Sequence, residues 1–505
     1  MANPRRSASS RNWRIDTLSD QDFERQIRQV RSLLHPIIPK AKTRMRTKIC
    51  LPRRPTPGQW RWRGVLLRSC VPLALAVGLR AGAAEAPSPA GQTPAGTFDV
   101  RKFGAQGDGK TVDTAAIQKA LDECGKAGGG TVRFPAAIYL SQPISLRSKT
   151  TLLLDPGATL KATDDPKDYL PSSVTWEDVL LGRSKGPFLN FVNGKKLVDV
   201  AITGKGTIDG SGARWWAPAE EARRKVPGYT LPRPNLIRIT GCKGLKVTGV
   251  TLQNSPKFHL VPEDCEDVLI ENVTILAPEG AANTDAIDPT MSRRVTITNC
   301  LIDVGDDNVA IKSGKGMRGR EFACEDLTIT DCIFKHGHGL SIGSETAGGV
   351  RNLTVKRCSF EGTQNGIRIK SPRGKGGKVE NLVYEDITMT NVEGAITFTC
   401  YYPKIPRTDA AQTVNAETPC FRNIRIRNLT ATSTYAAGVI IGLPESLVSN
   451  VVLENVQITA ATTGLTIRNS TGVQLKNVRV TAKEGPPFVV QDAQVQGLER
   501  ADQKR

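Results

Sequence analysis

Four short polar motifs carry the residues of this 505-residue chain that are best suited to chemistry. They are Asn283–Asp285, Gly305–Asp307, Gly337–Gly339 and Arg368–Lys370, and together they hold three aspartates, one histidine and two cations. Carboxylates that lie close together repel one another, which raises the pKa of one of them and supplies a proton donor. The others can activate water, as in glycoside hydrolysis, and cations can bind a sugar carboxylate. The motifs therefore predict a site that cleaves an acidic polymer.

Each motif taken alone also has a purely structural explanation. Asn-Thr-Asp and Gly-Asp-Asp are common turns, and Asp-rich turns also bind calcium. Arg-Ile-Lys is an ordinary strand with a solvated face. His338 is more telling because the chain has only four histidines, of which we assign His336 to a solvated turn and His259 to packing. The order of the motifs, one per repeat, favours a shared site over four unrelated turns.

The motifs lie within a repeating pattern of short strands. Apolar residues alternate at 245–250, 268–273, 295–300 and 327–332, and further copies end at Cys358, Ile387, Leu429, Val456 and Val478. Successive copies end 22 to 42 residues apart, and no helical segment separates them. Strands of period two at this spacing cannot form βαβ units. They predict an all-β chain, a parallel β-helix in which each coil stacks on the last.

Alignment of the repeats predicts how the motifs meet. Matching Ile287 to Val309 places Asp285, Asp307 and His338 in one column on three neighbouring rungs, which are about 4.8 Å apart. Asp306 should project beside that column. The two cations of 368–370 alternate with inward isoleucines and should point outward on the next rung.

The first 84 residues hold most of the net charge. They contain 18 Lys and Arg against 4 Asp and Glu, whereas the whole chain contains 69 and 49. Once this leader is set aside, no surface motif of basic and aromatic residues remains, and we expect no nucleic-acid partner.

The leader resembles a secretion signal. Its apolar run, 65–79, is short and is interrupted by Arg68 and Pro72, and small residues follow at 81–83. This pattern predicts a signal peptide and no stable membrane span. Because 64 residues are too many to precede such a run, we expect that the start is mis-assigned and lies near Val65. The alternative is a cytosolic protein with a basic arm.

The composition of the rest predicts three further segments. Residues 85–96 are a linker, 97–490 are a β-helix catalytic domain, and 491–505 are a polar tail. Near its start, Asp113 should cap a short helix that ends at Gly125 and covers the open end of the stack. Its buried face comprises Ile117, Leu121 and Cys124.

The cysteines follow the repeats. Cys300, Cys332 and Cys358 share one column, which predicts stacked, buried thiols. Disulfides remain the alternative, with Cys400 and Cys420 as the leading pair. No cluster of Cys and His predicts zinc, and we expect no metal and no cofactor.

The motifs together resemble glycoside hydrolase family 28, the polygalacturonases. The resemblance covers roughly residues 96–480 and includes the segments 98–105 and 206–210. It implies a single-stranded, right-handed parallel β-helix of the pectin-lyase-like type. It also implies inverting hydrolysis of α-1,4-galacturonosidic bonds in pectin or polygalacturonate by an exported enzyme, periplasmic or extracellular, which we expect to be a monomer.

The resemblance also implies roles for the acid–base residues. Asp306 would be the general acid, Asp285 and Asp307 would activate the water, and His338 would tune the acid.

The remaining motif residues would bind the substrate. Asn283 would orient it, Arg368 and Lys370 would bind its carboxylate, and Tyr401 or Tyr402 would fill the position of a family tyrosine.

One residue departs from the family pattern. Asn308 stands where many relatives carry cysteine, in a ladder position and not in the acid–base set.

Several alternatives remain open at this stage. The insertion 215–234 could narrow the groove and favour exo-action, and the substrate could be rhamnogalacturonan or xylogalacturonan. A β-helix lyase would need calcium and a basic residue. A non-catalytic carbohydrate-binding or adhesin β-helix would release no sugar.

Overall fold

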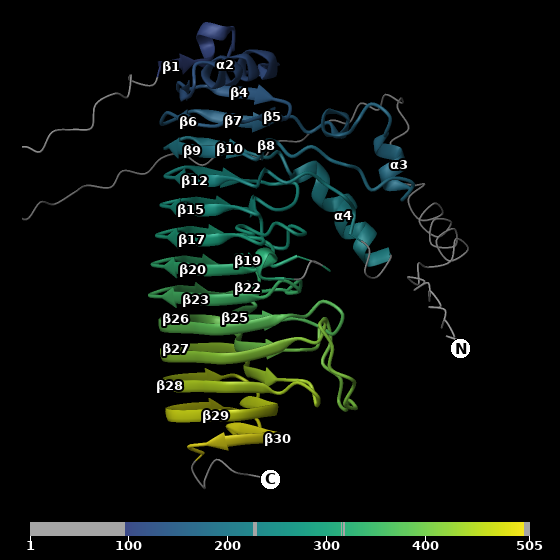
Figure 1. Ribbon diagram of the computed structural model, residues 1–505, viewed down its shortest axis with the longest axis vertical. Coiled ribbons are helices and arrows are strands. Elements are labelled where there is room, and N and C mark those ends of the chain that lie inside the picture. Colours follow the sequence, from purple (N-terminus) through teal and green to yellow (C-terminus); the bar gives the residue numbers. More distant parts are fainter. Residues whose placement is uncertain (1–95, 226–229, 315, 317–318, 499–505) are drawn as a thin grey trace, which may run out of the picture. The chain divides into compact units, whose positions relative to one another are not determined.

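The computed structural model describes residues 96–225, 230–314, 316 and 319–498. The predicted leader and signal peptide, and all of the predicted linker except residue 96, lie outside these residues. The described strands pair in parallel, rung on rung, along one axis, as Figure 1 shows. This is the predicted parallel β-helix.

The strands stack into three faces, although not every rung contributes a strand to each face. The first face contains β1 (Gly96–Asp99), β3 (Gly130–Phe134), β6 (Thr150–Leu154), β9 (Val198–Gly204), β12 (Lys243–Thr248), β15 (Glu266–Glu271), β17 (Arg293–Thr298), β20 (Cys324–Thr330) and β23 (Val350–Lys356). The second contains β2 (Asp108–Val112), β4 (Ile138–Ser141), β7 (Thr159–Ala162), β10 (Thr207–Asp209), β13 (Thr251–Gln253), β16 (Thr274–Leu276), β18 (Leu301–Asp303), β21 (Ile333–Lys335) and β24 (Ser359–Glu361).

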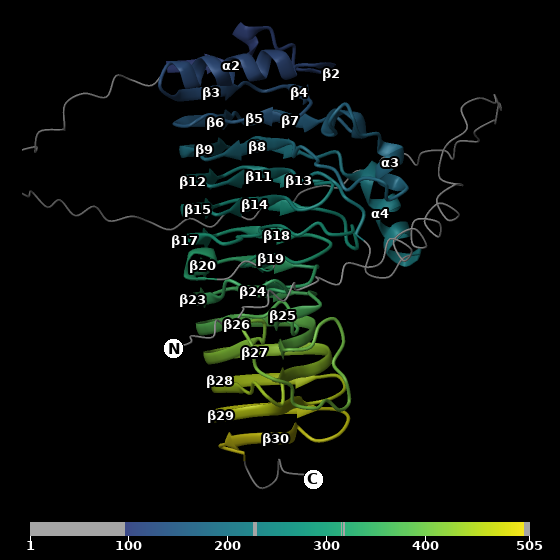
Figure 2. The ribbon, with the colours of Figure 1, turned by 45° about the vertical axis from the view of Figure 1, so that its right-hand side comes forward.

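The third face, which Figure 2 brings forward, carries the candidate site. It contains β5 (Ile144–Ser145), β8 (Val192–Lys195), β11 (Ile237–Thr240), β14 (Leu260–Glu263), β19 (Val309–Ile311), β22 (Leu340–Ile342) and β25 (Asn365–Lys370). The later strands are long and bend from face to face: β26 (Lys378–Thr399), β27 (Cys420–Ile441), β28 (Val448–Ala460), β29 (Leu465–Ala482) and β30 (Phe488–Gln496). The last strand thus runs beyond residue 490.

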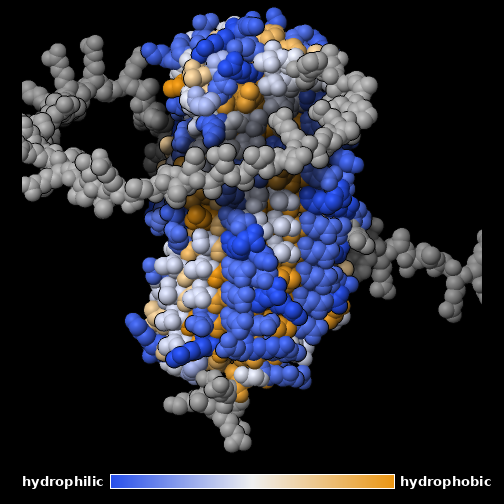
Figure 3. Space-filling model, turned by 90° about the vertical axis from the view of Figure 1, so that its left-hand side faces the viewer, coloured by the Kyte–Doolittle hydropathy of each residue, from blue (hydrophilic) through white to orange (hydrophobic). Residues whose placement is uncertain are grey.

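Apolar residues of like position stack inside the coil. One buried ladder on the first face runs through Leu245, Val268, Val295, Leu327, Leu353 and Leu382. Because side chains alternate across a strand, the neighbours of these residues point to solvent and also stack. Figure 3 shows the result as columns of similar hydropathy along the axis.

Asparagines stabilise the turns between faces. Asn428, Asn455 and Asn477 each adopt a left-handed φ of 53°. Asparagine tolerates this conformation better than most residues. Their side-chain amides bond from rung to rung, at 3.2 Å between Asn455 and Asn428 and 2.8 Å between Asn477 and Asn455. One ladder therefore supplies both the turn conformation and an inter-rung bond.

A helix covers the N-terminal rung, as predicted. α2 (Thr114–Lys126) buries Ile117, Leu121 and Cys124 against the stack, after the 3-10 turn η2 (Val100–Phe103). Asp113 holds the N-cap position, but its carboxylate accepts from the backbone N–H groups of Gln106 and Gly107, at 2.7 and 3.0 Å, and not from the helix. The helix continues through Gly125 to Lys126.

The described cysteines carry free thiols. Cys300, Cys332 and Cys358 are buried at matching positions of successive rungs, as predicted. Cys400 and Cys420 are not joined in the structure.

Candidate active site

Strand register brings the four motifs together on the third face. Bridges pair Leu260 with Ile287 and Ile287 with Val309, and Val309 pairs with Leu340 on β22. The residue two positions before each of the last three is Asp285, Asp307 or His338. The register therefore confirms the aligned column, and the next rung, β25, carries Arg368 and Lys370.

Asp307 is held by two cations. Its Oδ2 accepts from Lys370 Nζ at 2.9 Å, and its Oδ1 accepts from Arg368 and, at 2.9 Å, from the Ser341 hydroxyl. Burial raises the pKa of Asp307, but Arg368 and Lys370 outweigh burial and hold it far below its ordinary value. The two cations therefore favour the ionised form of Asp307.

Asp306 lies beside this cluster and is the most accessible of the three aspartates. Its side chain is 14% exposed, against 3% for Asp307 and 5% for Asp285. His338 Nδ1 lies 2.8 Å from Asp306 Oδ1, and Asn283 Nδ2 donates to Oδ2 at 3.4 Å. Burial is the largest influence on the pKa of Asp306 and raises it, but the hydrogen bond and charge of His338, together with the charge of Lys370, make the net shift downward.

Asp285 has the opposite electrostatic setting. Lys312 Nζ lies 3.4 Å from its Oδ2, and the same ammonium contacts Asp288. Burial first, and then Asp288 and Asp306, raise the pKa of Asp285 well above its ordinary value, and burial raises that of Asp288 to about 6. Oδ1 of Asp285 and Oδ1 of Asp288 accept no hydrogen bond from the described residues. Of the three motif aspartates, the one with the raised pKa is thus Asp285, not Asp306.

Sequence reasoning missed Asp288 and Lys312. Asp288 occupies the outward column that also contains Arg368, and Lys312 occupies the column of Lys370. Extending the column alignment by one outward position on each strand would have found both residues.

Arg233 is a third residue that the sequence did not reveal. It is 4% exposed, and its Nη2 donates to Asn283 Oδ1 at 2.7 Å while its Nη1 donates to the carbonyls of Ala282 and Pro256, at 2.8 and 2.9 Å. Asn283 itself adopts a left-handed φ of 54°. Arg233 therefore fixes the orientation of the amide that reaches Asp306.

Arg233 belongs to the insertion 215–234, whose described residues, 215–225 and 230–234, form a wall beside the site. The insertion contains most of α4 (Ala213–Lys225). Figures 1 and 2 show α4 beside the stack together with α3 (Trp176–Leu180). An apolar cluster joins this wall to the site; it comprises Leu170, Val179, Ala219, Ala222, Leu231 and Ala282.

Two further 3-10 turns lie in the connections, η3 (Pro166–Tyr169) and η4 (Arg320–Phe322).

The two candidate tyrosines differ in access. Tyr401 is 8% exposed and its hydroxyl donates to Asp409 Oδ2 at 2.8 Å. Tyr402 is 41% exposed, and Lys370 Nζ lies 5.2 Å from the centroid of its ring. Of the two, Tyr402 is the more exposed and lies next to Lys370.

Three other polar residues near the motifs lie in surroundings that indicate a structural role. His259 is fully buried, and burial lowers its pKa to about 4, which leaves it neutral. His336 is on the solvated side, with Nδ1 2.8 Å from Asp303 Oδ1. Asn308 is buried, accepts from Gly339 N at 2.8 Å and donates to the Lys335 carbonyl at 3.2 Å. Asn308 thus ties two rungs together.

Possible metal-binding atoms are present in the site. Donor atoms of Asp306, Asp307 and His338 lie within 4.8 Å of one another. The oxygens of Asp307 are already bound by Arg368 and Lys370, however, so the negative charge that would attract a cation is largely compensated. The arrangement fits proton transfer and anion binding better than metal binding.

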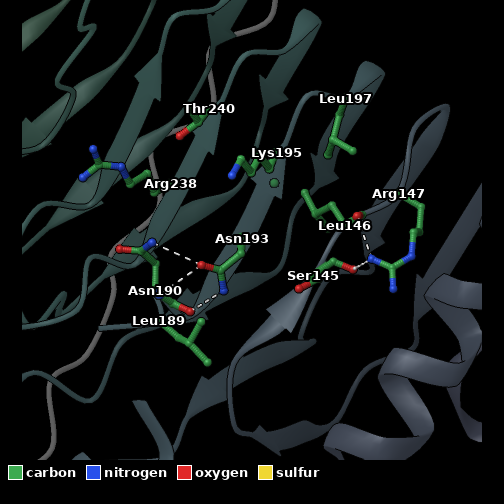
Figure 4. Close-up of a pocket in the computed structure, with 11 residues that line it drawn as sticks. Ser145, Leu146, Arg147, Leu189, Asn190, Asn193, Lys195, Leu197, Arg238 and Thr240 are labelled. Atoms are coloured by element: carbon green, nitrogen blue, oxygen red, sulfur yellow. Dashed lines mark hydrogen bonds between the residues drawn. The ribbon is translucent and has the colours of Figure 1, made fainter. Parts of the chain in front are cut away.

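The third face is also hollowed further toward the N-terminus. A cavity of about 610 Å³ opens over β5, β8 and β11, and Figure 4 shows Asn193, Lys195, Arg238 and Thr240 around it. Arg238 is held by Glu263 at 2.7 Å. The cavity lies on the same face as the motifs, over strands nearer the N-terminus.

Comparison with known proteins agrees with this geometry. The model of the family "Glycosyl hydrolases family 28" matches residues 124–482. An endo-polygalacturonase of Pectobacterium carotovorum subsp. carotovorum is 35% identical over 380 residues, which are 73% of this chain and 87% of that protein.

Solved structures of the same kind are also similar. An exopolygalacturonase from Thermotoga maritima superposes with a TM-score of 0.63 and 28% identity, over 76% of this chain and 93% of that one. A polygalacturonase from Erwinia carotovora ssp. carotovora superposes with a TM-score of 0.61 and 28% identity, over 81% of this chain and 99% of that one.

Proposed function

This chain belongs to glycosyl hydrolases family 28, and from that premise we propose that it hydrolyses α-1,4-galacturonosidic bonds in pectin or polygalacturonate with inversion. It is a glycoside hydrolase of the polygalacturonase family. The observation that carries the proposal is the pairing of an accessible carboxyl, Asp306, with a carboxylate, Asp307, that two cations keep ionised. Acid, base and anion-binding groups then lie within three rungs of one another.

In the proposed reaction Asp306 gives its proton to the glycosidic oxygen as the bond from that oxygen to the anomeric carbon breaks. His338 and the nearby Lys370 lower the pKa of Asp306 in the unliganded cleft. A substrate carboxylate on Lys370 would cancel part of that effect. Substrate binding should therefore raise the pKa of Asp306 and load it with a proton.

Water attacks the anomeric carbon from the opposite side of the sugar. We assign its proton to Asp285, because its raised pKa makes it the stronger base. Asp307, with its lowered pKa, is a poor proton acceptor and is better suited to hold the water and the substrate in place. The step leaves Asp306 ionised and Asp285 protonated, and proton exchange with solvent restores the starting state.

The sugar that lies next to the broken bond, toward the C-terminal end of the β-helix, would be bound by Arg368, Lys370 and Tyr402. The two cations offer a carboxylate several donors, and the exposed ring of Tyr402 offers an apolar surface beside them. Asn283, which Arg233 holds in place, would orient the sugar near Asp306.

The wall of α3 and α4 motivates one alternative within the family, namely exo-action on chain ends. Rhamnogalacturonan and xylogalacturonan are alternative substrates. From the apolar run 65–79 of the leader we propose export to the periplasm or outside the cell. We also propose that the protein is a monomer. No helix among the described residues is long and apolar enough to cross a membrane.

Digestion of polygalacturonate tests the proposal. We expect the full chain to release reducing sugar with or without a chelator, and to form no unsaturated product that absorbs in the near ultraviolet. A loss of activity with the chelator, or an unsaturated product, would favour a lyase, and no release at all would favour a binding protein. Product sizes separate the two modes of action, because an exo-enzyme releases only the shortest products from the start.

A further inference from the structure

Lys257 is a cation near the site that the reaction above does not use. It precedes β14 and is half-buried, and its Nζ lies 4.4 Å from the centroid of the Phe258 ring. Within the described residues its ammonium meets this ring and forms no ion pair with a carboxylate. A half-buried ammonium without an anion is unfavourable, because burial removes water that no partner replaces.

Register places Lys257 in line with the acid. Leu260 pairs with Ile287, which pairs with Val309, so Lys257 occupies on its rung the position that Asp306 occupies two rungs later. Lys370 lies two rungs beyond Asp306, through β22 and β25. Rungs are about 4.8 Å apart, so cations flank Asp306 at about 10 Å along the axis on either side.

The other charged groups around Lys257 leave it available. Burial, Arg233 and Lys312 lower its pKa to about 8. Arg233 is bound by carbonyls and by Asn283, and Lys312 is bound by Asp285 and Asp288. Lys257 is therefore the cation of this group that could accept an anionic ligand without giving up a hydrogen bond or an ion pair.

We propose that Lys257 binds the carboxylate of the sugar on the N-terminal side of the scissile bond, opposite the sugar bound by Arg368 and Lys370. The inference rests on the proposed function. It makes a free carboxylate on each of the two flanking sugars a requirement for fast cleavage. The enzyme should therefore discriminate against methyl ester at both positions, not only at one.

The test compares Lys257→Met, Lys257→Arg and a control, Lys246→Met, whose side chain is exposed on β12 of another face. On polygalacturonate we expect Lys257→Met to lower kcat/KM by about 10- to 100-fold, the range of one hydrogen bond to a charged group. Lys257→Arg should restore most of the loss, and Lys246→Met should match the wild type. On highly methyl-esterified pectin, Lys257→Met and the wild type should be nearly equal.

A binding measurement keeps the inference separate from catalysis. In an Asp306→Asn background, calorimetry with trigalacturonate should show weaker binding by the added Lys257→Met, and binding should weaken above about pH 8 as the ammonium loses its proton. Unchanged affinity and unchanged kcat/KM would overturn the inference, as would an equal loss on methyl-esterified pectin. If the wild type binds trigalacturonate but cleaves no polygalacturonate, the proposed function fails while the role of Lys257 is still decided.

Discussion

Asp306→Asn is expected to lower kcat on polygalacturonate by about 10²- to 10⁴-fold, the usual contribution of a general acid. Asparagine has the same shape and can still accept the bond from Asp307 N, which measures 2.8 Å, so the fold should be retained. It cannot donate the proton that the leaving oxygen needs. Initial rates of reducing-sugar release, with circular dichroism as the check on folding, measure the effect.

Asp303→Asn is the matched control for this variant. Asp303 ends β18, three residues before Asp306, and its partner is His336 on the solvated side. We expect its kcat to stay within about threefold of the wild type, since surface changes away from the site have small effects. If Asp306→Asn lost no more activity than Asp303→Asn, Asp306 would not be the acid.

The same assignment fixes the sign of the pH dependence. Asp306 must carry a proton, and its pKa is lowered overall because His338 and Lys370 oppose the effect of burial. The active form is therefore lost as the pH rises, and kcat/KM should fall on the alkaline side. Asp285 must be ionised, and burial raises its pKa, so kcat/KM should also fall as the pH drops on the acid side. The expected profile is a bell, and Asp306→Asn should lose its alkaline limb.

Asp307→Asn is expected to have the second large effect, on stability as well as on activity. The change leaves the ammonium of Lys370 and the guanidinium of Arg368, with side chains 7% and 11% exposed, without their anion. Breaking a buried ion pair by removing one partner costs about 3–5 kcal/mol. We expect a loss of that size in the free energy of unfolding in urea at pH 7, and a fall in kcat of at least about 100-fold.

The pH dependence of the stabilisation by Asp307 shows that unfolding should be measured near neutral pH. The folded pKa of Asp307 is below its ordinary value, so its stabilisation is present above the pKa of an unfolded aspartate and is lost as the pH falls through the lower folded pKa. The double variant Asp307→Asn/Lys370→Met removes one stranded cation and should regain part of the stability but none of the activity. Wild-type stability in Asp307→Asn would show that the ion cluster does not hold this part of the face.

The alignment of the motifs could be predicted because a β-helix translates sequence phase into position. Strands have period two and rungs stack in register, so matching Ile287 to Val309 was enough to place Asp285 beside Asp307. The capping helix was equally predictable from its one apolar face. In both cases the pattern of apolar residues within one strand or helix determines which residues come into contact.

The distribution of charge could not be predicted in the same way. Three neighbouring carboxylates imply that one pKa rises, but which one depends on where the cations lie. His338 bonds to Asp306, and Arg368 and Lys370 bond to Asp307, so the raised pKa falls on Asp285. These contacts depend on side-chain reach across two rungs, which the spacing of residues does not encode.

Contacts from connections were also hidden from the sequence. Arg233 reaches Asn283 from an insertion 50 residues earlier, and Asp409, in the long connection after β26, captures the hydroxyl of Tyr401. That second contact occupies the hydroxyl of Tyr401, and Tyr402, which is 41% exposed, is the tyrosine that we propose for substrate binding. Such segments have no repeat pattern to align, so the sequence could not decide between Tyr401 and Tyr402.

The most direct test of the central claim is proton NMR of the wild-type enzyme acting on polygalacturonate, recorded before the new reducing ends mutarotate. Hydrolysis by an acid and a water-activating base on opposite sides of the sugar inverts the anomeric carbon, so the α-linked polymer should give β-anomeric ends first. An initial excess of α-anomers would contradict the proposed roles of Asp306 and Asp285, and unsaturated ends would contradict hydrolysis itself.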